Sequence, residues 1–239
     1  MLSGKKILAV VPARSGSKGL PNKNMMQLSG ASLIAHAGIC LSELDWVDCK
    51  IISTDSEDYI KEGGKYGLES LFVRPPELSG DTSSALDTLS HAIVEAEKKK
   101  GEIFDVILLL EPTSPMRQPK DILDCVECLL EVNADSVVTV SHLDTKYHPD
   151  KVLKIGANNK LGFYTEKGHS IIARQQLDDL YWRNGICYAF KREIILEDKK
   201  LFSRKTYPLV IERDIVNIDE KFDFELAELL NRHLDDEKD

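Results

Sequence analysis

The chain lacks the features that mark several specialised classes of protein. Its five cysteines are odd in number and include a single C-x-x-C pair, which argues against a disulfide framework. No apolar run approaches the roughly 20 residues of a membrane-spanning helix, and no secretory signal follows the first lysines. Acidic residues outnumber basic ones by 40 to 31, and the net charge of −9 disfavours a nucleic-acid partner. We therefore expect a cytoplasmic globular protein with reduced thiols, without a membrane or nucleic-acid partner.

Strand-like apolar runs alternate with helical patterns over the first 140 residues. Strands are predicted at residues 7–11, 50–53, 70–73, 104–110 and 136–140, and helices at 32–44, 56–67, 84–100 and 119–132, with Ser32 and Ser56 as N-caps. This alternation predicts an α/β fold in which helices cover both faces of a mainly parallel sheet.

A polar stretch at about 141–179 interrupts this alternation. It contains the turn signal Ala157–Lys160, so we expect an excursion of hairpins from the sheet. Strands at 185–190 and 207–211 and a helix at 221–234 then complete a single domain over residues 1–239.

The loop after the first strand, residues 12–24, has the composition of an anion site. Arg14, Lys18 and Lys23 lie in it among small residues, and no acidic residue precedes Glu43. Ligands of parallel sheets bind beyond the carboxyl ends of the strands, where backbone amides and cations hold phosphates. The sequence therefore predicts a polyphosphate site. The P-loop and G-x-G-x-x-G motifs are absent, which disfavours an ATPase or a nicotinamide enzyme.

Six short motifs occur along the chain in a recognisable order. They are the loop at 12–24, Ser53-Thr54-Asp55-Ser56, R-P-P-E-L-S-G-D-T-S-S at 74–84, L-E-P-T-S-P-M-R at 110–117, R-Q-Q at 174–176 followed by Asn184-Gly185, and N-I-D at 217–219 followed by Asp223 and Glu228. In this order they resemble the acylneuraminate cytidylyltransferases, also called CMP-sialic acid synthetases.

The resemblance implies a fold, a reaction and partners. The fold would be three-layered and Rossmann-like, of the nucleotide-diphospho-sugar transferase type. The reaction would join CTP to a nine-carbon 2-keto sugar acid, such as sialic, legionaminic or another nonulosonic acid, giving a CMP-sugar and pyrophosphate with Mg²⁺. It also implies a homodimer formed through the excursion and a role in surface glycan biosynthesis. The eight-carbon acid Kdo is the alternative acceptor, and a catalytically silent nucleotide-binding module is the alternative function.

The resemblance also implies site residues, which we carry over position by position. The predicted catalytic residues are Arg14, Lys18, Lys23 and Arg174. The predicted CTP contacts are Ala13, Arg14, Ser15, Lys18, Asn24, Arg74, Asp81 and Ser83. The predicted sugar-acid contacts are Glu111, Thr113, Arg174, Gln176 and Tyr188. The predicted metal ligands are Asp219, Asn217 and Glu111.

Several of these residues allow a structural explanation as well. Asp81 orients the ribose, organises its own loop or caps the following helix. Tyr188 lines the sugar pocket or packs in the sheet, and Arg174 binds a carboxylate or makes a surface ion pair. The chain also departs from the family pattern at two positions. Glu111 stands where glutamine is usual, and Asn217 stands where the first aspartate of D-I-D is usual. Mg²⁺ needs only one or two carboxylates when phosphates supply further oxygens, so Asp219 with Glu111 or Asn217 would suffice.

Overall fold

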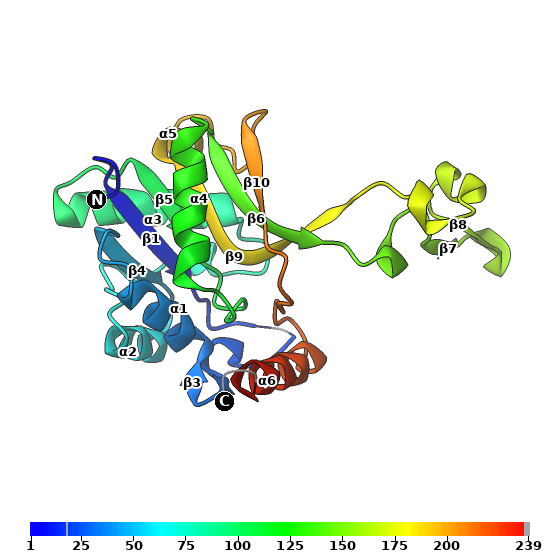
Figure 1. The fold of residues 1–239 in the computed structure, drawn as a ribbon. Coiled ribbons are helices and arrows are strands. Elements are labelled where there is room, and N and C mark those ends of the chain that lie inside the picture. The colour runs from blue at the N-terminus through cyan, green and yellow to red at the C-terminus, as the bar shows by residue number, and fades with distance from the viewer. Residues whose placement is uncertain (18, 237–239) are drawn as a thin grey trace.

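The computed structural model describes residues 1–17 and 19–236, and the predicted triphosphate contact Lys18 lies outside them. A six-stranded sheet forms the centre of the molecule (Figure 1). Its strands lie in the order β10 (Thr206–Val210), β6 (Ser136–His142), β9 (Tyr181–Lys191), β5 (Val106–Leu109), β1 (Ile7–Pro12) and β4 (Cys49–Ser53). β1 runs parallel to β4 and β5, and β10 runs parallel to β6, which confirms a mainly parallel sheet. β9 is the exception, since it is antiparallel to both of its neighbours.

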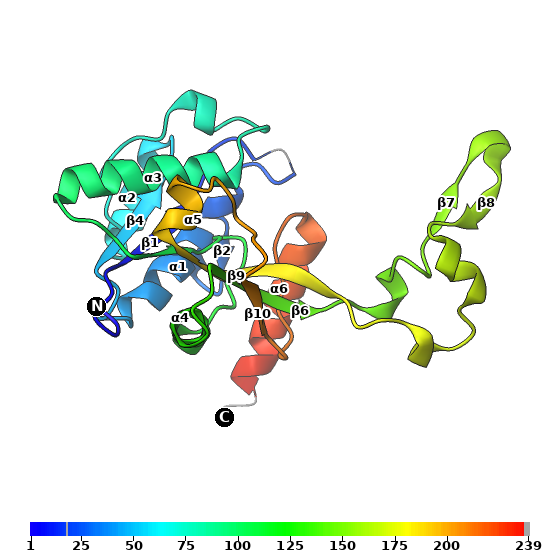
Figure 2. The same cartoon turned by 90° about the horizontal axis from the view of Figure 1, so that it is seen from above.

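Helices cover both faces because β1 is apolar on both of its sides. Ile7, Ala9 and Val11 face one way, toward α1 (Leu33–Ser42), α2 (Glu57–Lys65) and α4 (Pro119–Glu131). Leu8 and Val10 face the other way, toward α3 (Ala85–Lys100) and α5 (Arg192–Leu196). A strand buried on both faces requires this continuous apolar run. Figure 2 shows the resulting layers from above.

A smaller cluster holds the C-terminal helix α6 (Lys221–Asp236) against the short strands β2 (Gln27–Leu28) and β3 (Ala31–Ser32). Leu28, Ile218 and Phe224 are buried in it. Because Val216 and Ile218 also belong to this cluster, it holds the segment before α6 next to the loop that follows β1.

Serine side chains start three of the helices, as their N-cap positions in the sequence indicate. Ser32 Oγ accepts a hydrogen bond of 3.0 Å from the backbone N–H of Ala35, and Ser84 Oγ accepts one of the same length from Asp87. Ser56 does the same at the start of α2. The N-caps predicted at Ser32 and Ser56 are confirmed, and each satisfies a backbone donor that has no partner within its helix.

The strand predicted at residues 70–73 is wrong. Glu69 makes an isolated bridge to Ile51, and the following residues leave the edge of the sheet. Leu71 and Phe72 pack against the cluster beneath α3 instead of pairing, and two prolines follow at 75 and 76, where no N–H is available for a ladder. The chain therefore passes from the sheet edge directly to the carboxyl ends of the strands.

Residues 143–180 extend away from the sheet as a separate projection (Figures 1 and 2). It contains the antiparallel pair β7 (Leu153–Ile155) and β8 (Leu161–Phe163). Short 3-10 helices complete the fold: η1 (Lys23–Met25), η2 (Pro76–Leu78), η3 (Thr145–Tyr147), η4 (Ala157–Asn159), η5 (Glu166–Ser170) and η6 (Arg174–Gln176). Among the described residues, no helix is both long enough and apolar enough to cross a membrane.

Candidate functional site

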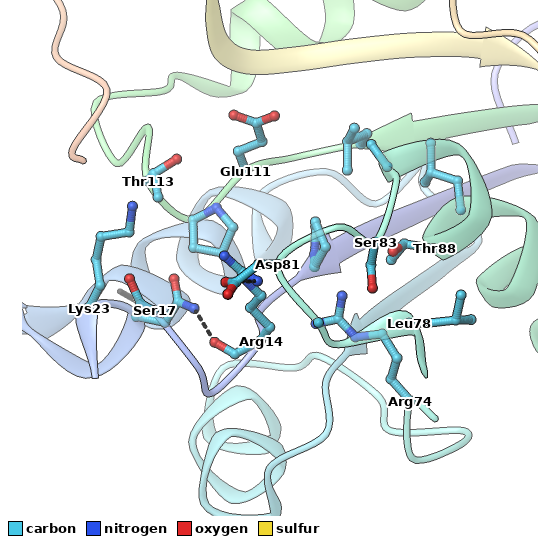
Figure 3. A pocket seen from close by; sticks show the side chains of 17 residues that line it. Arg14, Ser17, Lys23, Arg74, Leu78, Asp81, Ser83, Thr88, Glu111 and Thr113 are labelled. Atoms are coloured by element: carbon cyan, nitrogen blue, oxygen red, sulfur yellow. Dashed lines mark hydrogen bonds and ion pairs between the residues drawn. The ribbon is translucent and has the colours of Figure 1, made fainter. Parts of the chain in front are cut away.

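A cavity of about 340 Å³ opens at the carboxyl ends of β1 and β5 (Figure 3). This is the edge where ligands of parallel sheets bind. Its wall includes eight residues predicted from the sequence: Arg14, Lys23, Asn24, Arg74, Asp81, Ser83, Glu111 and Thr113. They come from three separate segments of the chain, and the fold brings them together.

Arg14 and Asp81 form an ion pair on the wall of this cavity. Arg14 Nη1 donates to Asp81 Oδ1 at 2.9 Å, and about a third of each side chain or more is exposed. Ser84 caps α3, so the prediction that Asp81 acts as a helix cap is wrong. Asn24 Nδ2 donates to the carbonyl of Arg14 at 3.2 Å, so the Asn24 amide also holds the loop that carries the guanidinium.

Asp55 fixes the middle of the same loop, a role that the sequence motif did not indicate. Its carboxylate accepts hydrogen bonds from the backbone N–H of Ser15 at 2.9 Å and from Ser15 Oγ at 2.8 Å. Burial alone would raise the pKa of Asp55, but the hydrogen bonds from Ser15 outweigh it, and the pKa lies below the usual aspartate value. Ser15 and the buried Ala13, both predicted as CTP contacts, lie outside the cavity lining and form its framework.

Arg74 is a buried cation on the cavity wall. It is 4% exposed, and its Nε and Nη2 atoms have no hydrogen-bond partner among the described residues. Burial lowers the pKa of Arg74, the charge of Asp55 opposes that shift, and the charge of Arg14 adds to it. A buried guanidinium without acceptors is costly. The arrangement is therefore suited to a ligand that brings acceptor atoms to it.

Glu111 occupies another part of the cavity, just after β5. Its carboxylate lies against Gly185, since a Cβ built on that glycine would meet Glu111 Oε2 at 2.6 Å and Asn217 Nδ2 at 3.4 Å. Burial raises the pKa of Glu111, and the charges of Arg117 and Arg183 oppose this rise. Asn217 Oδ1 is buried without a hydrogen-bond partner in the described part of the chain. Glu111 and Asn217 thus meet at one position.

Lys23 binds Asp219, the third predicted metal ligand, near Glu111 and Asn217. Its ammonium donates to Asp219 Oδ1 and to the carbonyl of Ile218, both at 2.8 Å. Gly19 permits this approach, because a Cβ there would lie 2.8 Å from the carbonyl oxygen of Asp219. The donor atoms at this end are carboxylate and amide oxygens, which suit Mg²⁺. The unpaired Asn217 oxygen fits the same ion.

Tyr188 and Thr113 differ in their surroundings. Tyr188 is 7% exposed on β9, lies outside the cavity lining and packs near Phe190, with ring centroids 6.5 Å apart. Burial and the charge of Glu111 raise the pKa of its hydroxyl. Thr113 lies on the cavity wall, and its carbonyl accepts from the backbone N–H of Ile218 at 2.7 Å. Tyr188 therefore packs in the sheet behind Glu111.

Arg174 and Gln176 lie on the projection and do not line this cavity. Arg174 is exposed on η6 and borders a second cavity of about 250 Å³ formed by the projection itself. Gln176 Oε1 accepts from the backbone N–H groups of Ile172 and Ala173 at 2.7 and 3.0 Å, so it stabilises the turn. Within one chain, these two predicted sugar-acid contacts are separated from the others because β6 and β9 carry the projection outward (Figure 2).

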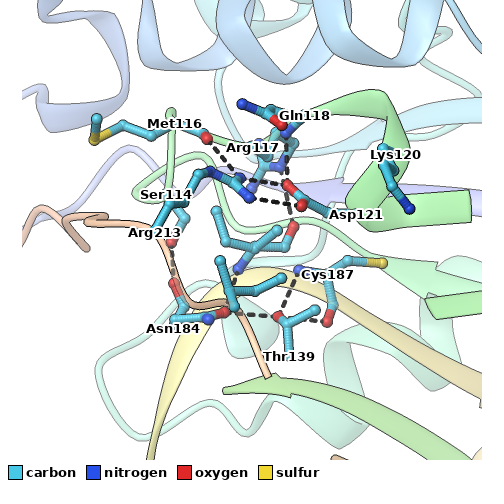
Figure 4. A network of polar contacts seen from close by, with 12 residues as sticks. Ser114, Met116, Arg117, Gln118, Lys120, Asp121, Thr139, Asn184, Cys187 and Arg213 are labelled. Atoms are coloured by element: carbon cyan, nitrogen blue, oxygen red, sulfur yellow. Dashed lines mark hydrogen bonds and ion pairs between the residues drawn. The ribbon is translucent and has the colours of Figure 1, made fainter. Parts of the chain in front are cut away.

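Arg117 is the functional candidate that the sequence analysis left without a role. Figure 4 shows it in a buried network with Asp121, Arg213 and Asn184. Its guanidinium donates to the main-chain carbonyls of Glu111, Gly185 and Ile186. Its place at the end of the motif at 110–117 was the available signal.

Comparison with known proteins gives consistent matches. A family model described as cytidylyltransferase matches residues 8–234. The chain is 33% identical over 227 residues to the CMP-N,N'-diacetyllegionaminic acid synthase of Legionella pneumophila, covering 94% of this chain and 96% of that protein. It is 32% identical over 226 residues to an N-acylneuraminate cytidylyltransferase of Streptococcus agalactiae, covering 92% of this chain and 52% of that protein.

The fold also matches solved structures. A CMP:2-keto-3-deoxy-manno-octonic acid synthetase complexed with CTP superposes with a TM-score of 0.68 at 15% sequence identity, covering 95% of this chain and 99% of that one. This likeness confirms the predicted Rossmann-like α/β architecture.

Proposed function

The chain belongs to the cytidylyltransferase family and is a CTP-dependent nucleotidyltransferase, and on this premise we propose that it activates a nine-carbon 2-keto sugar acid. The products would be the CMP-sugar and pyrophosphate. The observation that supports this best is the division of one cavity into two chemically different parts. Arg14 and Arg74 provide cations, whereas Glu111, with Asn217 beside it, provides carboxylate and amide groups.

The two arginines suit the nucleotide. Arg74 holds buried donors that find no acceptor within residues 1–17 and 19–236, and Arg14 lies on a loop whose conformation Asp55 and Asn24 already hold. Guanidinium groups bind phosphate oxygens through two parallel hydrogen bonds, and preorganised donors stabilise charge that develops on a leaving group. We assign Arg14, Lys18 and Lys23 to the triphosphate, and Arg74, Asp81 and Ser83 to the rest of the nucleotide.

The chemistry requires positioning above all. The 2-hydroxyl oxygen of the sugar acid attacks the α-phosphorus of CTP and loses its proton, while the bond to the bridging oxygen breaks and pyrophosphate leaves with the electron pair. Holding both anions in line accounts for most of the rate in such transfers. No covalent enzyme intermediate is required.

We assign Mg²⁺ to Asp219 with the Asn217 amide, and we assign the neighbouring Glu111 to the sugar acid. When bound, the ion would neutralise charge on the phosphates during transfer. The protein would supply oxygen ligands there, and the displaced Lys23 ammonium would be released to contact phosphate instead of Asp219.

We further propose a homodimer in the cytoplasm. The two-stranded β7–β8 pair exposes Leu153, Ile155 and Leu161 on one face, and an isolated hairpin with such a face is marginal in water. A second copy covering this face would bring Arg174 to the partner's cavity. Light scattering at micromolar concentration should give about twice the mass of the chain, and a monomer mass would exclude this assembly. The five free cysteines fit a reducing compartment.

Pyrophosphate release tests the function directly. The protein is incubated with CTP, Mg²⁺ and one acid at a time: N-acetylneuraminic acid, its deaminated relative, diacetyllegionaminic acid, pseudaminic acid or Kdo. Turnover with a nine-carbon acid supports the proposal. Turnover with Kdo alone would mean that the acceptor is an eight-carbon acid and not a nine-carbon one. CTP binding without turnover on any acid would favour a silent nucleotide-binding module.

A further inference from the structure

Arg117 is a buried cation that lacks an ionic partner. It is 6% exposed, and no carboxylate lies within ion-pair distance of it among residues 1–17 and 19–236. The nearby carboxylate of Asp121 is occupied by Arg213, at 2.5 and 2.8 Å. Burial lowers the pKa of Arg117 because the charged form has lost its hydration. A neutral side chain would be cheaper to bury here, so the charge and its donors need an explanation.

The hydrogen bonds of Arg117 join two segments of backbone next to the Glu111 side chain. Nη2 donates to the carbonyl of Glu111 and to that of Gly185 at 3.2 Å, and Nε donates to the carbonyl of Ile186 at 3.0 Å. Glu111 follows β5, whereas Gly185 and Ile186 belong to β9. One side chain thus sets the spacing between the end of β5 and this part of β9.

This part of β9 is irregular, which leaves its carbonyls in need of partners. Val138 of β6 lies opposite Tyr188 and Val140 lies opposite Arg183, so two steps along β6 correspond to five along β9. A bulge of this kind removes backbone groups from the ladder. Arg117 supplies donors to two of its carbonyls, and Thr139 Oγ1 binds Asn184 Oδ1 at 2.7 Å on the other side.

Gly185 is the point at which the Glu111 side chain contacts the part of β9 that Arg117 holds. Its φ of +72° and the absence of a Cβ allow the carboxylate of Glu111 to lie directly against its backbone. The Arg117 guanidinium therefore holds the backbone on both sides of the Glu111 side chain, at Glu111 itself and at Gly185.

We propose that Arg117 is a positioning residue for the sugar acid, acting through Glu111 and the β9 bulge and not through CTP. The inference rests on the proposed function, since it takes Glu111 as part of the acceptor side. The nucleotide side is held independently, by Asp55 on Ser15 and by the backbone contact of Arg74 with Thr54 at 2.8 Å. Loss of Arg117 should therefore affect the two substrates unequally.

A double-mutant cycle between Arg117→Met and Glu111→Gln tests this directly. Arg117→Met should raise the KM for the sugar acid about tenfold and change the KM for CTP less than about twofold. Because Arg117 acts through Glu111, the double variant should be no worse than the more impaired single variant. Arg117→Lys retains a charge but has fewer directed donors, and it should fall between wild type and Arg117→Met.

Two controls separate positioning from folding. Arg192→Met removes a comparable arginine, which donates to Glu97 at 2.7 Å far from the cavity, and should lower Tm without changing either KM. All assays are run well below the Tm of each variant. The proposal would be overturned if the effects of the two substitutions multiply in the double variant. It would also be overturned if Arg117→Met raises the KM for CTP as much as the KM for the sugar acid.

Failure of the proposed function gives a different result. If the wild-type protein turns over none of the acids, the function is wrong, and the positioning role is then decided by crystal structures of wild type and Arg117→Lys without substrates. The proposal requires the Glu111 side chain to leave the cavity wall in the variant. An unchanged Glu111 would refute it.

Discussion

Lys23 and Asp219, which are 196 positions apart in the sequence, form an ion pair of 2.8 Å at the mouth of the cavity. The Lys23 side chain is 11% exposed, whereas that of Asp219 is 73% exposed. The contact joins the loop after β1 to the segment before α6, so the phosphate side and the proposed metal side of the cavity are connected directly. A cation that binds Asp219 competes with Lys23 for the same carboxylate.

Metal dependence should follow from this competition. Removal of divalent cations with a chelator should abolish pyrophosphate release, and Asn217→Asp should lower the Mg²⁺ concentration for half-maximal activity about threefold or more, because a second carboxylate joins the site. Asn231→Asp on α6 adds the same charge away from the cavity and should leave that concentration unchanged. A Mg²⁺ titration of the three proteins decides between these outcomes. Equal effects of both substitutions would contradict the assigned site.

Arg14→Ala should remove activity and leave the fold intact. We expect kcat/KM to fall about 100-fold or more, because a charge-assisted contact to the triphosphate is lost. Its ion pair with Asp81 is exposed and contributes about 1 kcal/mol or less, so Tm should hardly change. Arg232→Ala, on the exposed face of α6, is the matched control. Near-native kcat/KM in Arg14→Ala would rule out its catalytic assignment.

Asp55→Asn should make stability less dependent on pH. The folded-state pKa of Asp55 lies below its unfolded value, so its ionised form stabilises the fold above about pH 4, and that contribution is lost as the pH falls through the folded-state pKa. We expect a loss of about 1 kcal/mol at pH 7 from weaker hydrogen bonds to Ser15, and a smaller loss at pH 3.

Thermal unfolding at both pH values measures this difference. Asp58→Asn, whose side chain is 82% exposed in the first turn of α2, is the control and should differ little from wild type. A loss in Asp55→Asn that is the same at pH 3 and pH 7 would contradict the ionised state inferred for the folded protein.

Gly185→Ala should destabilise the protein by more than its backbone conformation alone explains. A left-handed conformation costs an alanine roughly 1–2 kcal/mol, and at Gly185 the added Cβ would also meet Ser114 Oγ and Glu111 Oε2. Gly101→Ala isolates the first contribution, because Gly101 has φ +68° and nothing lies within 4 Å of its Cβ position. Chemical denaturation compares the two variants. An equal loss in both would mean that Glu111 and Ser114 move aside at no cost.

The predictions made from sequence were strongest where the signal is local. Ser32, Ser56 and the apolar run in β1 were recognised because capping and alternation depend on neighbouring residues. The failure at residues 70–73 has the opposite cause, and the same cause explains why the sequence indicated no direction for β9. Strand pairing depends on partners distant in sequence, and an apolar segment such as Leu71–Phe72 packs under a helix as readily as it pairs.

The sequence by itself determined the class of the protein: an alternating α/β chain, a cationic loop after the first strand, and six ordered motifs of a cytidylyltransferase. Only the tertiary structure decided that Arg74 is buried, with two guanidinium nitrogens that find no acceptor in the described part of the chain. It also decided that Arg117 joins Glu111 to the β9 bulge, and that Arg174 lies on a projection away from the cavity. The physical reason is that periodicity and capping act within a few residues. Desolvation, bulge geometry and charge pairing arise only when distant segments come into contact.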